Sequence, residues 1–551
     1  MKKIWLNRYQ QQVPAEINPD IYPSLNALFT ETCKKFQDLP ALSFFNTSIS
    51  YQKWAKLSQD FSAYLQKELQ LKKGDRVALM LPNCPQYMVS VFAVLQAGLT
   101  VINVNPLYTT PELVQQIKHS QAQAIIILAS FLPPLIRGLK ETHIKYVISS
   151  QLGDLLPWPR SWIINGLAKR LIKNKTEKTM HSSSMKFSKI LKQGSHLCLE
   201  PVTLQKGDIA FLQYTGGTTG KSKAAMLSHH NMLANIEQLT AWVRPVLREG
   251  QETMISALPL YHIFSLTVNG LMGLRLGGNN VLIPDARNIK HLISVLARHR
   301  FSVLLGVNTL FKALLQRAAF SQLDFSSLKI ALGGGAPLQA SVKVHWKEVT
   351  GKLLLEGYGL TEASPVVCAP PWDLVVAGNH VGLPLPSTDI RLRNEQGQSV
   401  PVGEVGELCV KGPQVMMAYW AADEVITAFD REGWLLTGDL ARLDQQGFVF
   451  IVGRKKELIL VSGFNVYPTE IEAVIQKHPK VSEVAVIGSP SEKTGEAVNA
   501  FVVRRDNTLH EKELLDYCHH YLTAYKVPTN IVFLESLPKS SLGKILKNKL
   551  K

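Results

Sequence analysis

The pattern that most constrains the fold lies in residues 20–150, where short apolar segments alternate with segments of helical spacing. Three apolar runs predict buried strands, at residues 76–81, 101–104 and 124–128. Two segments with apolar residues on one face predict helices, at residues 58–69 and 85–95. This alternation indicates a doubly wound α/β layer with a largely parallel sheet. Residues 105–109 follow a strand, where such sheets bind ligands, and a plain turn explains that segment equally well.

Length and charge restrict the classes of protein. A chain of 551 residues predicts two or more domains. The net charge of +17 implies anionic partners, which are nucleotides, phosphorylated cofactors, anionic lipid or nucleic acid. Six scattered cysteines without a CxxC pair argue against a zinc site and a disulfide framework, and fit a reducing compartment. The polar N-terminus predicts no signal peptide, and no apolar run reaches the ~18 residues of a spanning helix.

A segment rich in glycine, threonine and lysine follows the apolar run 209–212. Its residues are Tyr214, Thr215, Gly216, Gly217, Thr218, Thr219, Gly220, Lys221, Ser222, Lys223, Ala224 and Ala225. Glycines let backbone N–H groups face an anion, and lysines add positive charge, so the composition favours binding of nucleotide phosphates. It is not a Walker A loop, because only three residues separate Gly216 from Gly220. A flexible loop is the alternative interpretation.

Further motifs carry groups that suit a nucleotide. The triple glycine before Ala336 and Pro337, namely Gly333, Gly334 and Gly335, follows a predicted strand and allows close approach of a flat purine. A second run supplies a stacking ring, a hydroxyl and an oxygen ligand for Mg²⁺; it comprises Glu356, Gly357, Tyr358, Gly359, Leu360, Thr361 and Glu362. Three more candidates are each open to an ordinary structural explanation when taken alone: His262 in a loop, Asp439 after Thr437-Gly438, and Lys544 near the chain end.

In their order, these motifs resemble the adenylate-forming superfamily of acyl-CoA synthetases, luciferases and peptide-synthetase adenylation domains. The superfamily's phosphate loop ends in lysine and glycine, which align with Lys223 and Ala224, so the glycine is replaced here. The flanking sequence is similar to bacterial long-chain fatty acyl-CoA synthetases over the whole chain. The segments that carry this similarity are residues 2–9, 74–77, 105–108, 382–384 and 525–528.

The resemblance implies a fold and two domains. It implies an α/β adenylate-forming fold, in which residues 1–453 form doubly wound sheets plus a β-barrel-like part. Residues 454–551 would form a small mobile α+β domain that carries the catalytic lysine. The family's hinge between the domains falls on Lys456.

The resemblance also implies a two-step reaction with ATP, Mg²⁺ and coenzyme A. A fatty carboxylate attacks the α-phosphate of ATP, and the thiol of coenzyme A then displaces AMP. Lys544 would offset charge in the first step, and His262, Thr361 and Glu362 would complete the catalytic set. Glu362 and Thr218 would hold Mg²⁺. The remaining residues implied to bind nucleotide or cofactor include Asp439, Arg454, Lys456 and Gly463. Some relatives have a tryptophan gate where this chain has Leu266, so the gate is not carried over.

The segment 157–192 is strongly basic, with nine basic residues against Glu177 and a net charge of +8. Within it, apolar residues recur at helical spacing: Ile163, Ile164, Leu167, Ala168, Leu171 and Ile172. Together with Trp158 and Trp162, this pattern is typical of a helix that lies on a membrane surface, and an ordinary surface helix explains it equally well. We therefore expect a cytoplasmic enzyme in peripheral contact with the anionic inner membrane, with a homodimer as a further expectation.

The sequence argues against three other functions. A coumarate-type aryl-CoA ligase is disfavoured by the full-length resemblance and the basic amphipathic segment. A peptide-synthetase module would normally have a downstream carrier domain, whereas this sequence ends at Lys551. A nucleic-acid-binding protein would require a basic groove with interleaved aromatic residues or a recognised module, and neither is expected here.

Overall fold

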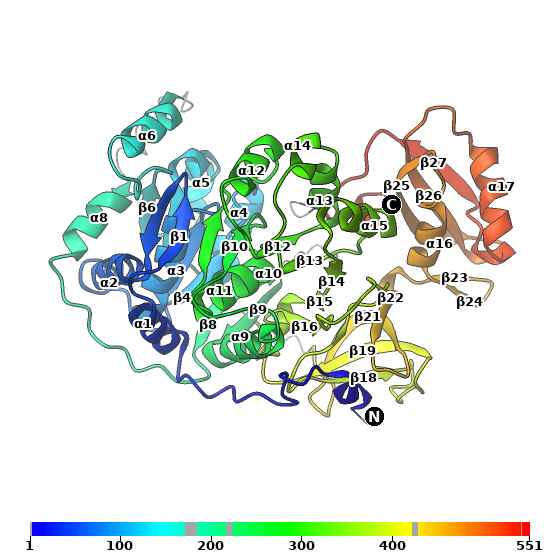
Figure 1. The fold of residues 1–551 in the computed structure, drawn as a ribbon, viewed down its shortest axis with the longest axis horizontal. Helices are drawn as coiled ribbons and strands as arrows, with labels where there is room; N and C mark the ends of the chain where they lie inside the picture. Colours follow the sequence, from blue (N-terminus) through cyan, green and yellow to red (C-terminus); the bar gives the residue numbers. More distant parts are fainter. Residues whose placement is uncertain (1–2, 171–183, 216–222, 421–427, 541–542, 551) are drawn as a thin grey trace.

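The computed structural model describes residues 3–170, 184–215, 223–420, 428–540 and 543–550. A large N-terminal part holds four of the sheets, and a smaller C-terminal part lies at one end of the molecule (Figure 1). The phosphate-loop residues 216–222 and the basic residues 171–183 lie outside the described residues.

One large sheet has eight strands among the described residues. In spatial order they are β20 (Tyr419–Trp420), β9 (Lys223–Ser228), β8 (Ile209–Thr215), β4 (Thr100–Asn103), β3 (Arg76–Met80), β5 (Ala124–Leu128), β6 (Tyr146–Ser150) and β7 (Met185–Lys186). The strands from β8 to β7 pair in parallel, whereas β9 and β20 add antiparallel at the edge. The five residues of β5 are all buried, as expected for a strand covered on both faces. The predicted strands and the doubly wound layer are confirmed.

The second large sheet has seven strands in the described part of the chain. They are β14 (Leu354–Glu356), β13 (Ile330–Gly333), β12 (Val303–Gly306), β10 (Thr253–Ser256), β11 (Asn279–Leu282), β1 (Pro40–Phe44) and β2 (Thr47–Ser50). Every pair except β1–β2 is parallel. The carboxyl ends of these strands therefore meet at one edge of the sheet, where ligands bind in open α/β folds.

Helices cover both large sheets (Figure 1). In the N-terminal part they are α1 (Leu25–Lys35), α2 (Tyr51–Lys67), α3 (Pro85–Gln96), α4 (Thr110–Ser120), α5 (Leu132–Gly138), α6 (Arg160–Arg170), α8 (Phe187–Gly194), α9 (His229–Val243), α10 (Ile263–Ser265), α11 (Met272–Arg275), α12 (Ile289–Leu296), α13 (Asn308–Leu315), α14 (Ala318–Ser321) and α15 (Ala340–Thr350). Local sequence sets several starts. Thr109 and Glu112 form a capping box that begins α4, and the Ser50 side chain accepts the N–H of Lys53 at the start of α2.

Two smaller antiparallel sheets complete the N-terminal part, where the β-barrel-like part was expected. One contains β18 (Asp389–Arg393), β19 (Val405–Lys411), β21 (Leu435–Leu443) and β22 (Val449–Arg454), and the other contains β15 (Tyr358–Gly359), β16 (Val366–Ala369) and β17 (Leu383–Pro384). Short helical turns follow two of these strands: η5 (Thr361–Ala363) follows β15, and η6 (Lys455–Glu457) leads from β22 to the C-terminal part.

The C-terminal part has a hydrophobic core of its own, built from residues between Ile459 and Ile531. Its sheet consists of β24 (Phe464–Val466), β23 (Ile459–Val461), β26 (Gly495–Arg504), β25 (Val481–Ser491) and β27 (Asn530–Leu534), packed with α16 (Pro468–Ile475) and α17 (Glu511–Tyr521). A separate core is what an independently moving unit requires. The domain boundary at residue 454 stays a prediction.

Neither a disulfide framework nor a spanning helix was expected from the sequence. All six cysteines are described and free; Cys198 is exposed and the other five are buried. No helix in the described ranges is both long enough and apolar enough to cross a bilayer.

Candidate functional site

The ends of the phosphate loop are fixed by a pair of antiparallel strands. Strand β8 ends at Thr215 and β9 begins at Lys223, and these two residues are register partners. Ala224 pairs with Tyr214 inside the sheet, so the position where the superfamily has glycine belongs to a strand and needs no positive φ. The Tyr214 hydroxyl lies 2.7 Å from Nδ1 of His119 on α4. Gly216 to Ser222, including the expected metal ligand Thr218, lie outside the described residues.

The triple glycine turns sharply at the carboxyl end of β13. Gly335 has a φ of +79°, a conformation that L side chains rarely adopt. A Cβ atom on Gly334 would lie 3.1 Å from Cζ of Phe264, so a side chain there would crowd the ring. Ala336 and Pro337 continue the turn towards the surface. Gly357 donates its N–H to the carbonyl of Gly333 at 3.0 Å, which joins this turn to the next motif.

Glu356 pairs with Lys343, whereas Tyr358 of the same motif contacts Asp439. Its Oε2 lies 2.9 Å from the ammonium nitrogen of Lys343, and both side chains are nearly buried. Oε2 also accepts the N–H of Leu338 at 3.3 Å. Glu356 therefore joins α15 to the glycine turn, and its role at a nucleotide stays a prediction.

Two other predicted residues, Tyr358 and Arg454, contact the carboxylate of Asp439. Oδ2 accepts the hydroxyl of Tyr358 at 2.7 Å, and Oδ1 lies 3.0 Å from Nε of Arg454. Asp439 is a register partner of Arg454 in the β21–β22 pair, so the two side chains start from adjacent backbone positions. Gly438 has a φ of +70° within β21, so the turn expected there is an irregularity inside a strand. Burial and the negative Asp439 raise the pKa of Tyr358, which keeps its hydroxyl a donor.

A second constellation surrounds Glu362. The hydroxyl of Tyr419 donates to Glu362 Oε1 at 2.5 Å, and the backbone carbonyl of Glu362 accepts the N–H of Met416 at 2.7 Å. The Lys223 ammonium lies 5.1 Å from the centre of the Tyr419 ring. Carboxylate oxygens are ligands that Mg²⁺ prefers. Tyr419 holds one oxygen of Glu362, and this arrangement fits an Mg²⁺ ion on the other.

Lys544 lies in the space between the two parts of the chain. Lys544 is accessible to solvent, but the surrounding protein removes part of its hydration; this desolvation, followed by the positive charge of Arg454, lowers the pKa of Lys544, while Asp439 and Glu457 act in the opposite direction. Burial, reinforced by the charge of Lys544, lowers the pKa of His262 to about 4, so His262 is neutral near pH 7. A neutral ring agrees with the geometry, because His262 Nδ1 accepts the N–H of Phe264 at 3.3 Å. Lys544, His262, Asp439 and Arg454 thus share one electrostatic environment.

An apolar cavity of about 70 Å³ opens from this environment into the N-terminal part. Residues of the predicted site line one end, namely His262, Gly334, Gly335, Tyr358, Gly359 and Thr361. Apolar side chains from α9, β12 and β13 line the rest, among them Leu239, Trp242, Val303, Leu305, Ile330 and Leu332. Leu266 is fully buried in the π-helical segment Leu266–Leu271, and Val268 of that segment lines the cavity instead.

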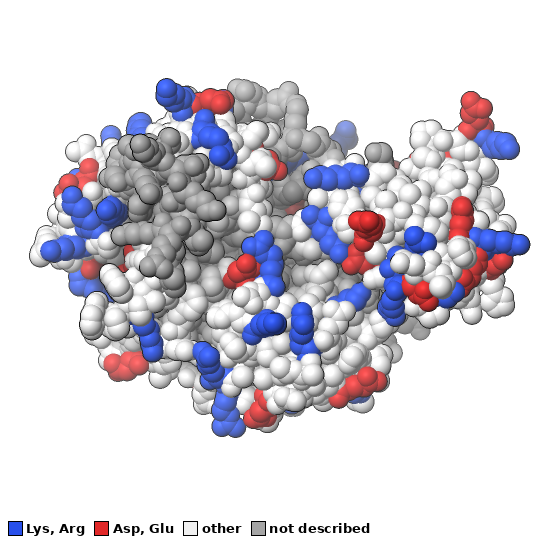
Figure 2. Space-filling model, turned by 90° about the horizontal axis from the view of Figure 1, so that it is seen from above, with Lys and Arg blue, Asp and Glu red and all other residues white. Residues whose placement is uncertain are grey.

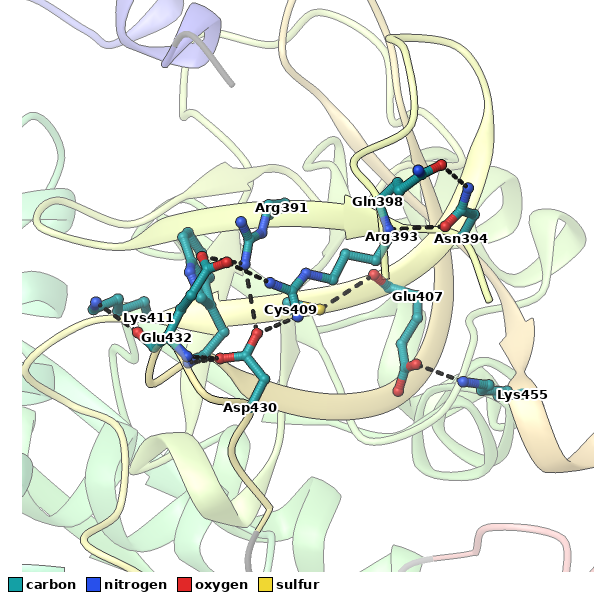
Figure 3. A network of polar contacts seen from close by, with 11 residues as sticks. Arg391, Arg393, Asn394, Gln398, Glu407, Cys409, Lys411, Asp430, Glu432 and Lys455 are labelled. Atoms are coloured by element: carbon teal, nitrogen blue, oxygen red, sulfur yellow. Dashed lines mark hydrogen bonds and ion pairs between the residues drawn. The ribbon is translucent and has the colours of Figure 1, made fainter. Parts of the chain in front are cut away.

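Ion pairs attach the residues on either side of Lys456 to the two parts of the chain: Lys455 pairs with the N-terminal part and Glu457 with the C-terminal part. Lys455 Nζ is 2.8 Å from Glu407 Oε2 on β19, beside the ion pairs that Arg391 and Arg393 form with Asp430 (Figure 3). Gly463 has a φ of +84° in an exposed turn between β23 and β24, away from the Asp439 constellation. The structure therefore does not bring Gly463 together with the other predicted residues.

Comparisons with known proteins agree with this geometry. Residues 29–420 match the family model described as AMP-binding enzyme, and residues 470–544 match the AMP-binding enzyme C-terminal domain. The chain belongs to the AMP-binding enzyme family. Within this family, the long-chain-fatty-acid–CoA ligase of Escherichia coli is 48% identical, over 100% of this chain and 98% of the relative. A probable 4-coumarate–CoA ligase of Dictyostelium discoideum is 33% identical, over 88% of this chain and 86% of the relative.

Solved structures of this family share the fold. The ATP-bound MatB structure from Rhodopseudomonas palustris is 29% identical and has a TM-score of 0.80, covering 96% of this chain and 98% of its own. The adenylate-forming fold expected from the sequence is thereby confirmed.

Tyr419, His119 and Trp242 were missed by the sequence analysis. Each lies outside the glycine-rich motifs, in a segment that resembles an ordinary strand or helix. Tyr419 and Trp420 follow the polar and glycine-containing residues 411–414, and no spacing in the sequence relates them to Glu362.

Proposed function

We propose that this chain joins long-chain fatty acids to coenzyme A in two steps, with ATP and Mg²⁺, releasing pyrophosphate and AMP. The observation that carries the proposal is the cavity, which joins an apolar interior to Tyr358, Thr361 and His262. An acyl chain would occupy the apolar part, with its carboxylate at the polar end. The 48% identity to a long-chain-fatty-acid–CoA ligase over the full length supports the same substrate class.

Lys544 would act in the first step. A carboxylate is a poor electrophile, so it must be activated before the thiol can attack it. In the activating step the carboxylate itself attacks a phosphate, and negative charge gathers between these two anions. The Lys544 ammonium would offset this charge, which is the usual role of a fixed cation in a transition state, and its electrostatic interaction with Asp439 and Arg454 supports this role. His262, neutral because of burial, would face the carboxylate without adding a second cation. Thr361 would contribute a hydroxyl at the same end of the cavity.

The nucleotide would lie between the group of residues around Asp439 and the group around Glu362. Asp439 and Arg454 would hold the ribose, Gly334 and Gly335 would leave space for the base, and Lys223 would contact the phosphates at the end of their loop. Glu362 would hold Mg²⁺, which supplies positive charge to the phosphate oxygens.

The second step would require the C-terminal domain, residues 454–551, to rotate about Lys456. The separate core of this domain supports such motion. Gly463 and its neighbours Ser462 and Phe464 are exposed here, so they are available to face the site after rotation. In this second arrangement they would approach coenzyme A.

Contact with a membrane surface is part of the proposal, because long-chain fatty acids dissolve in bilayers. Helix α6 protrudes from the large part (Figure 1); Trp158, just before it, is 82% exposed, and Trp162 and Ile163 within it are 74% and 49% exposed. Ile164 of this helix packs against the core. On the face that Figure 2 shows, basic side chains lie among acidic ones. The attraction to anionic lipid would come from the basic residues of the segment 157–192.

The decisive experiment is pyrophosphate release by the purified enzyme with ATP and one of three substrates: oleate, coumarate or a mixture of amino acids. Release with oleate that depends on Mg²⁺, followed by thioester formation when coenzyme A is added, is the expected result. Faster release with coumarate would assign the chain to the aryl-CoA ligases. Release with amino acids alone would indicate an adenylation module.

A further inference from the structure

The loop that carries Lys544 is held at both ends by other lysines. At one end, Lys539 Nζ lies 2.6 Å from Oε1 of Glu483 on β25. At the other end, Lys547 Nζ lies 2.7 Å from Oε1 of Glu472 on α16 and 3.3 Å from Oε2 of Glu457. Lys544 forms no ion pair within the described residues, so the two flanking lysines anchor the loop and leave the third available for a ligand.

The backbone of this loop is closed between its anchors. Lys539 and Ile545 form an isolated β-bridge, and the N–H of Leu546 donates to the carbonyl of Pro538 at 2.8 Å. The N–H of Ser540 donates to the carbonyl of Lys544, also at 2.8 Å. The position of Lys544 therefore depends on where the two ends are attached.

Lys547 differs from Lys539 in one of its partners. Glu457 directly follows the hinge residue Lys456, whereas Lys455 directly precedes it and pairs with Glu407 of the N-terminal part. Ion pairs thus fix the residue before Lys456 to one part of the molecule and the residue after it to the loop. Glu472 is itself held, because its Oε1 accepts the N–H of Val486 at 2.8 Å. The Lys547 and Glu472 side chains are only 17% and 20% exposed, which limits screening by water.

We propose that Lys547 is a positioning residue that ties the segment carrying Lys544 to Glu457, so that rotation about Lys456 brings Lys544 to a defined place. This inference rests on the proposed two-step function. Without Lys547, the side-chain attachment of the loop to the rest of the C-terminal part is the Lys539–Glu483 ion pair alone, and without Glu457 the loop loses its ion pair to the residue after Lys456, so Lys544 no longer arrives at a defined place. A misplacement of about 1 Å in a reacting group can reduce a rate by about 100-fold.

The test compares Lys547→Met with Lys549→Met in the full-length enzyme. Lys549 lies on the same short helical turn, is exposed and forms no ion pair within the described residues, so its variant is a matched control. We expect Lys547→Met to lower kcat for acyl-AMP formation by about 100-fold with an unchanged KM for ATP. Thioester formation from supplied acyl-AMP should proceed at the wild-type rate, because the first-step position of Lys544 is not used there.

Two further variants separate positioning from folding. Lys547→Arg keeps the charge and should restore most of the acyl-AMP rate. Glu457→Gln removes only the tie to the hinge and should impair acyl-AMP formation selectively, even if Lys547→Met does not fold. The proposal is overturned if Lys547→Met matches Lys549→Met, if Lys547→Arg is as slow as Lys547→Met, or if Glu457→Gln slows both half-reactions equally. A wild-type enzyme without oleate-dependent pyrophosphate release would instead refute the proposed function.

Discussion

The hydroxyl of Tyr419 donates to Oε1 of Glu362 at 2.5 Å, across 57 residues of sequence. Burial and the charge of Glu362 both raise the pKa of Tyr419, so the phenol keeps its proton and remains a donor. This bond restricts the rotation of Glu362 and leaves its second oxygen to bind a cation. Residues that hydrogen-bond to a metal ligand, as Tyr419 would to Glu362, commonly set the affinity for the metal.

Tyr419→Phe should therefore weaken Mg²⁺ binding. We expect the Mg²⁺ concentration for half-maximal pyrophosphate release to rise about 10-fold. The measurement is a Mg²⁺ titration at saturating ATP, and Tyr521→Phe, at an exposed tyrosine of the C-terminal domain, is the control. Coincident titration curves for Tyr419→Phe and the wild type would contradict this role.

Asp439→Asn tests the ribose contact. Asp439 is 5% exposed and has both oxygens engaged, so the change leaves Arg454 without its partner and weakens ribose binding. Loss of charged hydrogen bonds worth about 3 kcal/mol would raise the KM for ATP by about 100-fold. The wild type should prefer ATP over 2′-deoxy-ATP, and the variant should lose most of that preference. An unchanged preference would show that Asp439 does not contact the ribose.

The rate of acyl-AMP formation should fall at high pH, when Lys544 loses its proton. Desolvation and Arg454 lower the pKa of Lys544, and the ammonium is charged only below that pKa. Acyl-AMP formation should therefore decline, as pH rises, at a lower pH than an ordinary lysine would give. Lys544→Arg should move this decline to higher pH, and Lys544→Ala should abolish acyl-AMP formation while sparing thioester formation from acyl-AMP. Wild-type pyrophosphate release by Lys544→Ala would exclude the catalytic role.

Chain-length preference should depend on the inner end of the cavity. Val303 lines that end at the start of β12, opposite the glycine turn that closes β13. Val303→Phe should fill this space, lower kcat/KM for oleate and spare octanoate, at a stability cost of about 1–3 kcal/mol. Val342→Phe, in the same core but outside the cavity lining, controls for that cost. Equal losses on both fatty acids would place the acyl chain elsewhere.

Membrane binding should depend on charge and salt. Replacing five basic residues with glutamine should release the enzyme from anionic vesicles: Lys169, Arg170, Lys173, Lys175 and Lys178. Each basic residue near an anionic surface contributes about 1 kcal/mol, and salt screens the attraction. Co-sedimentation at low and high salt measures the effect. A control with the same charge change replaces exposed residues of the C-terminal domain: Lys477, Lys493, Arg505, Lys512 and Lys549. Equal sedimentation of all three proteins would make this segment an ordinary loop.

The strands and the motif order were predictable because their signals are local. A run such as Ala124–Leu128 is apolar throughout and can only be buried, and glycine at 335 is required by its positive φ. The site was predictable only where a motif carries it. Glu356 illustrates the limit, because its motif suggested a ligand while its Lys343 partner lies on a helix that precedes it in sequence.

Contacts between distant segments gave no signal in a single sequence. The Tyr419–Glu362 bond depends on β20 joining the edge of a sheet whose other strands lie hundreds of residues earlier. The ion pairs of Lys547 likewise depend on α16 and η6 lying together after folding. A lysine near the chain end has no local feature that distinguishes an anchor from a catalytic group.

Gly543, at the tip of the Lys544 loop, lies against Thr309 of α13 in the N-terminal part. A Cβ atom on Gly543 would be 2.6 Å from Oγ1 of Thr309, and its φ is +76°. The two parts of the enzyme therefore meet beside Lys544, the proposed catalytic lysine, so closely that a methyl group on Gly543 would press against the Thr309 side chain. A small compound wedged between these two residues would stop acyl-AMP formation while resembling neither ATP nor a fatty acid. Inhibition at this contact would be insensitive to the concentration of either substrate.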